Sequence, residues 1–217
     1  ATLTTQAAAL HADTFAQPGF SAAGAIGTDI TLATSSLLKV ASGQTLSLAG
    51  NWTNNGGSYN AGAGTVNFNG TSQTIGGSTS TTFFNISTSG STNTSPGIAT
   101  TIGGALSVGD GTTFTMPAFA VTVTGTTTVG GGTSGTLSIT SATGAKTFGG
   151  LVTVNPGGTW DNSSANVALS FAGGITNNGT FNAGTGVQTF ATNAQALNGT
   201  LIIPNVTVTT ITLTNNG

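Results

Sequence analysis

The chain has very little charge. Of its 217 residues only 3% are Asp, Glu, Lys or Arg, whereas ordinary soluble domains contain roughly 25%. Two Lys and no Arg cannot neutralise a run of phosphates, so the composition excludes a strong nucleic-acid-binding surface. A net charge of −2 also gives little electrostatic protection against self-association. There is no Glu either, and the charged residues are Asp13, Asp29, Lys39, Asp110, Lys146 and Asp161.

Cysteine and long apolar runs are missing as well. Without Cys the chain has no disulfide, no thiolate metal site and no thiol nucleophile. No apolar run approaches the roughly 20 residues that span a bilayer, so the sequence predicts no membrane-spanning segment. The chain starts at Ala1 without an initiator Met. This start fits an exported chain whose signal peptide has been removed, and equally an excised fragment.

The few titratable residues do not form a recognisable site. Polysaccharide lyases and hydrolases need clustered carboxylates, but the four Asp are far apart in the sequence. Asp110 lies in Val-Gly-Asp-Gly, which favours a turn role, and Asp161 is not in register with it. His11 is the only His and cannot form a metal site alone, so we expect it in a cap or an interface. We predict no catalytic residue, no metal site and no cofactor, and therefore a protein that is not an enzyme.

A repeated unit is the main positive feature. Residues 103–114 (GGALSVGDGTTF) return at 149–160 as GGLVTVNPGGTW, and a shorter version, GGITNNGTF, occupies 173–181. Each unit is a Gly-Gly corner, a short alternating strand, a Gly-bearing turn and a Thr–aromatic pair. The mean step between successive corners is about 25 residues, with one short step between positions 130 and 149. The corners are Ala49-Gly50, Gly76-Gly77, Gly103-Gly104, Gly130-Gly131, Gly149-Gly150, Gly173-Gly174 and Asn198-Gly199.

Longer matches suggest the same period. Thr53–Gly56 (TNNG) recurs at 176–179, and Gln73–Gly77 recurs at 195–199, which this period places five coils later. A period in the twenties with Thr, Val and Ile strands and Gly or Asn turns is typical of a parallel β-solenoid. We predict about eight irregular coils over residues 26–217, with inward Val, Ile, Leu and aromatic side chains forming the core. The alternative is an antiparallel sandwich or donor-strand jelly roll.

The two ends of the chain differ from the middle. Residues 1–25 are predicted to be a cap or an assembly segment, with an Ala-rich helix over residues 4–17 that ends before Pro18-Gly19. The chain stops at Thr214–Gly217, a third copy of TNNG. We therefore expect an incomplete last coil with free backbone groups that can pair with another chain.

Residues 64–86 (GTVNFNGTSQTIGGSTSTTFFNI) resemble a repeat of large exported bacterial surface proteins, in which such units are concatenated into adhesin-like β-solenoids. The resemblance covers about residues 45–90 well and 170–217 in part. It implies an extracellular structural or adhesive role and provides no catalytic residues.

The expected function is thus a structural extracellular or cell-surface protein, a subunit that assembles head-to-tail with copies of itself into a filament or surface layer. One alternative is a segment of a large surface adhesin, and another is a carbohydrate-binding module that uses Trp52, Tyr59 or Trp160 as stacking platforms. Thr-x-Thr pairs could order water or bind ice only if the coils stacked Thr in register, which the unequal spacing argues against. Glycans are possible partners because eight Asn-x-Ser/Thr sequons occur, at Asn51, Asn69, Asn85, Asn93, Asn162, Asn178, Asn198 and Asn205.

Overall fold

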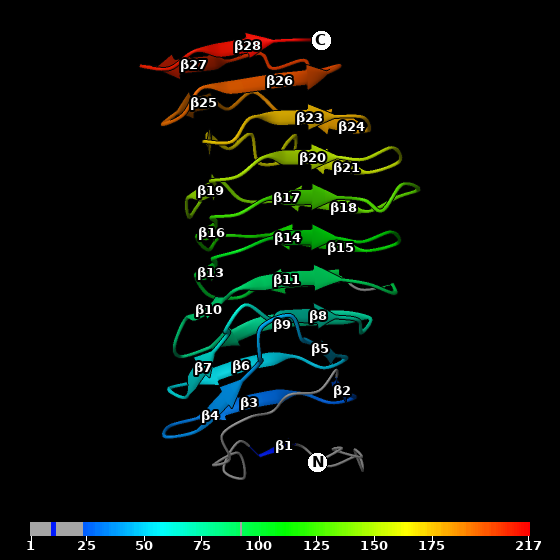
Figure 1. Cartoon of the computed structure of the whole chain (residues 1–217), viewed down its shortest axis with the longest axis vertical. Helices are drawn as coiled ribbons and strands as arrows, with labels where there is room; N and C mark the ends of the chain where they lie inside the picture. Colours follow the sequence, from blue (N-terminus) through cyan, green and yellow to red (C-terminus); the bar gives the residue numbers. More distant parts are fainter. Residues whose placement is uncertain (1–9, 12–23, 92) are drawn as a thin grey trace.

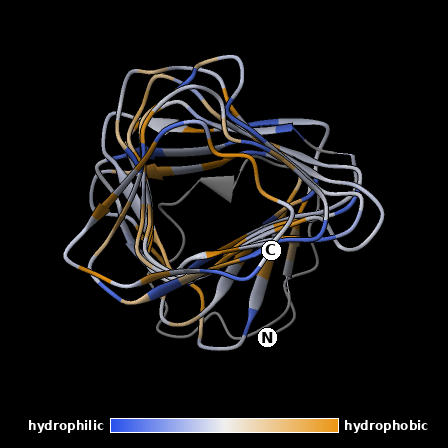
Figure 2. Cartoon of the chain, turned by 90° about the horizontal axis from the view of Figure 1, so that it is seen from above, coloured by the Kyte–Doolittle hydropathy of each residue, from blue (hydrophilic) through white to orange (hydrophobic). Residues whose placement is uncertain are grey.

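The fold is a parallel β-solenoid, as the sequence predicts. The computed structural model describes residues 10–11, 24–91 and 93–217, and all their regular elements are β-strands. Every pair of neighbouring strands in these residues is parallel. The coils stack into one column (Figure 1), and a view along the column shows a rounded three-sided outline (Figure 2). The antiparallel sandwich is therefore excluded.

From β2 to β25 each coil passes through three faces in the same order. Sheet B holds β2 (Gly24–Ile26), β5 (Thr45–Leu48), β8 (Thr65–Phe68), β11 (Asn85–Thr88), β14 (Leu106–Val108), β17 (Thr127–Val129), β20 (Val152–Val154), β23 (Ile175–Asn177), β26 (Gln195–Gly199) and β28 (Leu213–Asn215). Sheet A follows with β1 (Leu10–His11), β3 (Ile30–Ala33), β6 (Trp52–Asn55), β9 (Ser72–Gly77), β12 (Asn93–Pro96), β15 (Thr113–Met116), β18 (Thr136–Ile139), β21 (Thr159–Asp161) and β24 (Thr180–Asn182).

The third face is split into two sheets. Sheet C holds β4 (Leu37–Lys39) and β7 (Ser58–Asn60). Sheet D holds β10 (Thr81–Phe83), β13 (Thr100–Ile102), β16 (Val121–Val123), β19 (Lys146–Phe148), β22 (Leu169–Phe171), β25 (Gln188–Ala191) and β27 (Val206–Thr209). The strands β7 and β10 belong to successive coils but do not pair, so the third face is interrupted between them.

The coils are shorter and more numerous than the corner spacing predicts. Along sheet B one coil runs only from Ala196 to its partner Thr214, whereas the longest runs from Thr128 to its partner Thr153. Ten sheet B strands define nine such steps, so the column has nine coils where the sequence predicted about eight.

The predicted period is wrong because the corners are not equivalent. Gly103-Gly104 connects sheet D to sheet B, Gly130-Gly131 connects sheet B to sheet A, and Gly76-Gly77 ends a sheet A strand. The step from one of these corners to the next is therefore one coil plus one side of the following coil. Likewise Gln73 lies in sheet A and Gln195 in sheet B, so the stretch between them is not a whole number of coils.

Alternation along the strands builds the core. In β15 Phe114 and Met116 are buried, while Thr113 and Thr115 point outward, which is the period of two expected of a strand with one buried face. Aromatic rings stack between coils, with ring centroids 5.6 Å apart for Phe148 and Phe171 and 5.4 Å apart for Phe171 and Phe190. The predicted core of Val, Ile, Leu and aromatic side chains is confirmed.

The N-terminal prediction can be checked at two residues. Leu10 and His11 form β1, which pairs in parallel with β3, so the helix expected over residues 4–17 is wrong at these positions. The remaining residues of the expected cap, apart from Gly24 and Ala25 in β2, lie outside the described part of the chain, and so does Asp13.

Candidate functional site

The described carboxylates bind backbone turns instead of gathering into a site. Asp110 Oδ1 accepts hydrogen bonds from the backbone N–H groups of Gly131 (2.7 Å), Ser134 (3.0 Å) and Thr133 (3.2 Å). These bonds stabilise the carboxylate and lower the pKa of Asp110 to about 2. Asp110 was expected to stabilise its own Val-Gly-Asp-Gly turn; its carboxylate instead holds the turn at residues 131–134, one coil further along the chain.

The two other described Asp residues do the same. Asp29 Oδ1 accepts from the backbone N–H of Asn51 at 2.6 Å, and Asp161 Oδ1 accepts from the backbone N–H of Ser163 at 2.9 Å. No group of three or more His, Cys, Asp or Glu among the described residues could hold a metal ion.

Lys146 is a buried ammonium that the sequence did not identify. Its side chain points inward from β19 and is almost completely buried. Nζ donates to the carbonyl oxygens of Thr143 (2.6 Å), Pro117 (2.7 Å) and Gly144 (2.7 Å), with that of Ser141 at 3.4 Å. Burial lowers the pKa of Lys146, while the carbonyl dipoles favour the charged form. No carboxylate among the described residues pairs with it, so we assign it to structure: it holds two corner loops together.

The aromatic residues considered as sugar platforms are mostly inaccessible. The rings of Trp52 and Trp160 are fully buried in the core, so neither can stack on a sugar. Tyr59 packs edge-on against Trp52 with ring centroids 4.7 Å apart, and its buried hydroxyl has no hydrogen-bond partner among the described residues. Burial raises the pKa of Tyr59. The carbohydrate-binding hypothesis loses two of its three proposed contact residues.

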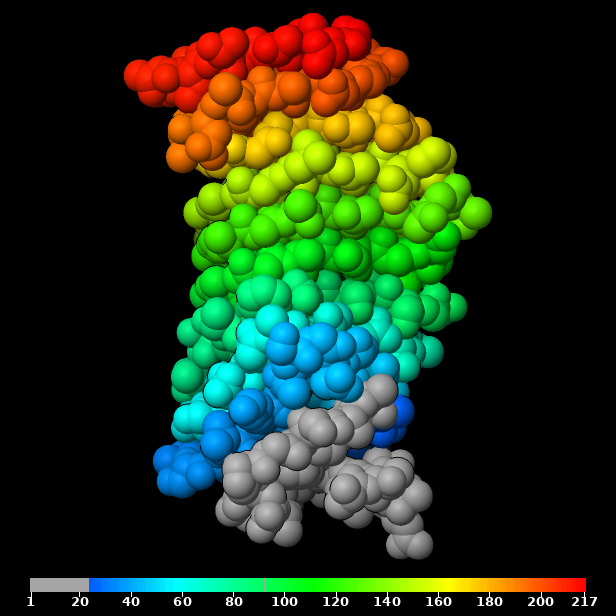
Figure 3. Space-filling view, in the orientation of Figure 1, coloured from blue at the N-terminus to red at the C-terminus, as the bar shows by residue number. Residues whose placement is uncertain are grey.

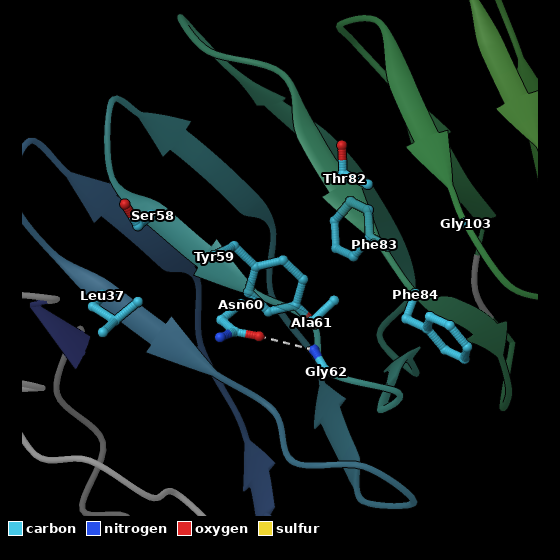
Figure 4. A pocket seen from close by; sticks show the side chains of 10 residues that line it. All are labelled: Leu37, Ser58, Tyr59, Asn60, Ala61, Gly62, Thr82, Phe83, Phe84 and Gly103. Carbon is cyan, nitrogen blue, oxygen red and sulfur yellow. Dashed lines mark hydrogen bonds between the residues drawn. The ribbon is translucent and has the colours of Figure 1, made fainter.

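Tyr59 nevertheless lines a cleft where the third face is interrupted. The cleft has a volume of about 580 Å³ and lies between β7 and β10. Figure 4 shows Tyr59 beside Phe83, with Leu37 on one side and the partly exposed Phe84 on the other. The cleft is open, uncharged and formed mainly by two strand edges that do not pair.

Thr residues on sheet D stand in register despite the unequal coils. The central outward column is Thr82, Thr101, Thr122, Thr147, Ser170, Thr189 and Thr207. The prediction that the unequal spacing prevents such stacking is wrong, because the extra residues lie in the corners and leave the strands aligned.

One sequon is buried. Asn162 is fully buried, and its Nδ2 donates to the carbonyls of Val167 and Ala183, both at 2.8 Å. A glycan cannot be attached to Asn162 in the folded chain, whereas Asn69 and Asn205 are exposed.

The two ends of the column differ in how well they cover the core. At the start of the column Ile26, Ile30 and Leu38 are buried. At the other end Val206 and Val208 of β27 are 45% and 44% exposed, although they continue the inward column of Gln188 and Phe190, which are fully buried. The last coil, at the top of Figure 3, therefore presents inward apolar side chains to solvent.

The last coil also lacks a strand in sheet A. Its residues 200–205 form no strand above β24, and a groove of about 700 Å³ lies there, lined by Phe181, Asn182, Ile202 and Pro204 among others. The sequence predicted an incomplete last coil with free backbone groups, but it did not identify the exposed apolar side chains of this end; the alternation Val206-Thr207-Val208-Thr209 was the only signal for them.

No helix among the described residues is long and apolar enough to cross a membrane. Neither a protein-family model, nor a curated protein, nor a solved structure matches the chain.

Proposed function

We propose that the chain is a structural, non-enzymatic extracellular subunit of a filament or surface layer, assembled through contacts between β-coils of successive copies. The observation that carries the proposal is the exposure of Val206 and Val208 at the open end of the core. Inward side chains of a solenoid are stabilised by the next coil, which removes their apolar surface from water.

The backbone at this end supports the same function. Among the described residues β27 pairs only with β25, and β28 pairs only with β26. Each strand therefore has a free edge, and a free edge is a template for a strand of another chain. The near absence of charge means that two copies meet little electrostatic repulsion.

A second candidate is a segment of a large surface adhesin. The open end favours it as well, because a further segment of the same polypeptide would cover Val206 and Val208. Detection of the native protein on the cell surface at a much greater mass would support this candidate.

The test is the assembly of the purified 217-residue chain. We expect sedimentation to show concentration-dependent polymers and electron microscopy to show fibres. Val208→Lys places a charge on the open end and should prevent assembly. Val187→Lys is the matched control, because Val187 is 42% exposed but precedes β25 on the outer surface. A wild-type chain that stays monomeric at high concentration would overturn the proposal, and so would equal assembly of both variants.

A further inference from the structure

The third face of the column contains two strand edges that face each other without pairing. Among the described residues β7 pairs only with β4, and β10 pairs only with β13. The two strands belong to successive coils, and these coils are joined on the other two faces, where β6 pairs with β9 and β5 pairs with β8. The interruption is therefore confined to one side of the column, and the paired sheets on the other sides hold its two edges in place.

The hydrogen bonds of β7 show which of its backbone groups face the interruption. Ser58 N–H donates to the carbonyl oxygen of Ser36 at 2.8 Å, and the carbonyl oxygen of Asn60 accepts from Val40 N–H at 3.1 Å. In a parallel ladder, a residue between two that bond to one neighbouring strand directs its own backbone groups to the opposite side. The N–H and C=O of Tyr59 therefore point away from β4 and toward β10.

The same alternation places one residue of β10 on the facing edge. The carbonyl oxygen of Phe83 accepts from Gly103 N–H at 2.9 Å, directly after β13. The preceding residue, Thr82, therefore directs its N–H and C=O away from β13 and toward β7. No described strand pairs with either edge, so among the described residues the backbone groups of Tyr59 and Thr82 have no ladder partner.

The cleft between these edges is large enough for a ligand and has an apolar lining. Its volume of about 580 Å³ lies within the usual range of ligand sites. The rings of Tyr59 and Phe83 lie side by side in it, with centroids 5.5 Å apart (Figure 4). Leu37 and Phe84, which are 49% and 37% exposed, lie on opposite sides of these rings. No Asp or Lys lines the cleft, so a charged ligand would find no counter-charge there.

Free backbone groups beside apolar rings favour a polypeptide as the occupant. An extended main chain carries N–H and C=O groups on both of its sides at the spacing of a strand, and so it can pair with both edges at once. A sugar would need several polar side chains that are free to bind it. The amide oxygen of Asn60 is already used, because it accepts from the backbone N–H of Gly62 at 3.1 Å.

We propose that the interruption between β7 and β10 binds an extended, uncharged peptide segment of another polypeptide, which pairs with the backbone groups of Tyr59 and Thr82. The peptide residue that bonds to Thr82 lies opposite Tyr59 and shares its inward direction, so an apolar side chain is favoured there. Its two neighbours bond to Tyr59 and point outward, so polar side chains are favoured at those positions. This binding site is a second function of the chain and does not depend on the assembly of a filament.

The probe is a fluorescently labelled heptapeptide with the sequence of residues 120–126, AVTVTGT, which has the required apolar residue between two Thr. We expect fluorescence anisotropy to show saturable binding to the 217-residue chain. The control peptide AVTPTGT lacks the central N–H and should bind more weakly.

A matched pair of variants locates the site. Thr82→Pro removes the N–H that faces the cleft, and Pro is tolerated in an edge strand whose N–H lies on the unpaired side. It should weaken binding about tenfold, the effect of one lost hydrogen bond, without changing the unfolding midpoint. Thr82→Ala keeps the N–H and should bind like the wild type. If the peptide binds Thr82→Pro as tightly as the wild type, it binds elsewhere and the proposal is refuted.

Amide hydrogen exchange followed by NMR tests the site without any variant. We expect the amide protons of Tyr59 and Thr82 to exchange rapidly in the chain alone and to be protected when AVTVTGT is added. If both are already protected in the chain alone, another segment of the chain fills the interruption and the proposal is wrong. Exchange that stays rapid in the presence of the peptide, or equal binding of AVTVTGT and AVTPTGT, would also overturn it.

Discussion

Replacing Lys146 with Met should destabilise the chain far more than replacing Lys39 with Met. The ammonium makes three hydrogen bonds of 2.6–2.7 Å to carbonyl oxygens of Thr143, Pro117 and Gly144. Hydrogen bonds to a charged group contribute about 1.5–3 kcal/mol each, and an abandoned buried acceptor costs about 1–3 kcal/mol. Burying the ammonium itself costs several kcal/mol, which Met avoids. Water can also reach the corner loops in part, so we expect a net loss of about 2–4 kcal/mol.

The assay is urea unfolding, followed by circular dichroism, of the wild type, Lys146→Met and the control Lys39→Met. Lys39 is exposed on β4 and its ammonium makes no hydrogen bond within the described residues, so its replacement should change the free energy of unfolding by less than about 0.5 kcal/mol. If Lys146→Met changes it by no more than Lys39→Met does, the carbonyl contacts do not stabilise the loops and the reasoning is wrong.

Three further predictions concern turns and rings. Because the pKa of Asp110 is lowered to about 2, its contribution to the free energy of unfolding is complete above the ordinary value of 3.8 and is lost as the pH falls through 2. In Asp110→Asn the free energy of unfolding should therefore depend less on pH in this range. Gly77 has φ 121° and no room for a Cβ, whereas a Cβ at Gly76 would meet open space. Thermal unfolding should therefore show that Gly77→Ala lowers the free energy of unfolding by at least about 2 kcal/mol and that Gly76→Ala leaves it almost unchanged. Trp52 Nε1 donates to Thr81 Oγ1 at 3.0 Å, but Trp160 Nε1 has no partner among the described residues. Denaturant titration should therefore find Trp52→Phe more destabilising than Trp160→Phe by about 1 kcal/mol. The reverse order would contradict this reasoning.

The sequence predicted the fold class but not the length of a coil, for a physical reason. All three sides of a coil have the same local pattern, in which a short strand with inward apolar residues is followed by a turn. The motif TNNG illustrates this, because its first copy ends β6 in sheet A and its second ends β23 in sheet B. In both copies the second residue, Asn54 or Asn177, accepts from a backbone N–H of the following turn. A search for repeated motifs therefore finds sides that resemble one another but belong to different sheets. The spacing of such motifs does not give the length of a coil.

The end surface could be predicted only in part. An incomplete last coil follows from the third TNNG, but its exposed Val206 and Val208 require knowledge of which side each strand occupies. The burial of Lys146 could not be predicted either, because a single Lys between Ala145 and Thr147 gives no sign that its side chain points inward. Its burial depends on carbonyls of Pro117 and Ser141, which only the stacking of coils brings together.

Two of the rare charged residues, Asp110 and Lys146, bind the irregular loops of the longest coil, and this explains how unequal coils keep their register. The longest coil contains an extra turn at residues 130–135, where Gly130, Gly132 and Gly135 have positive φ and no ladder partner is available to several backbone N–H groups. The carboxylate of Asp110 binds three of those groups, from Gly131 to Ser134. In the same coil the loop before β19 leaves carbonyls without strand partners, and the ammonium of Lys146 binds them. A charge is the strongest single partner for several backbone dipoles at once, so one side chain can fold an insertion against the column. The strands on either side then stay aligned, which is the condition for continuing a sheet from one copy into another.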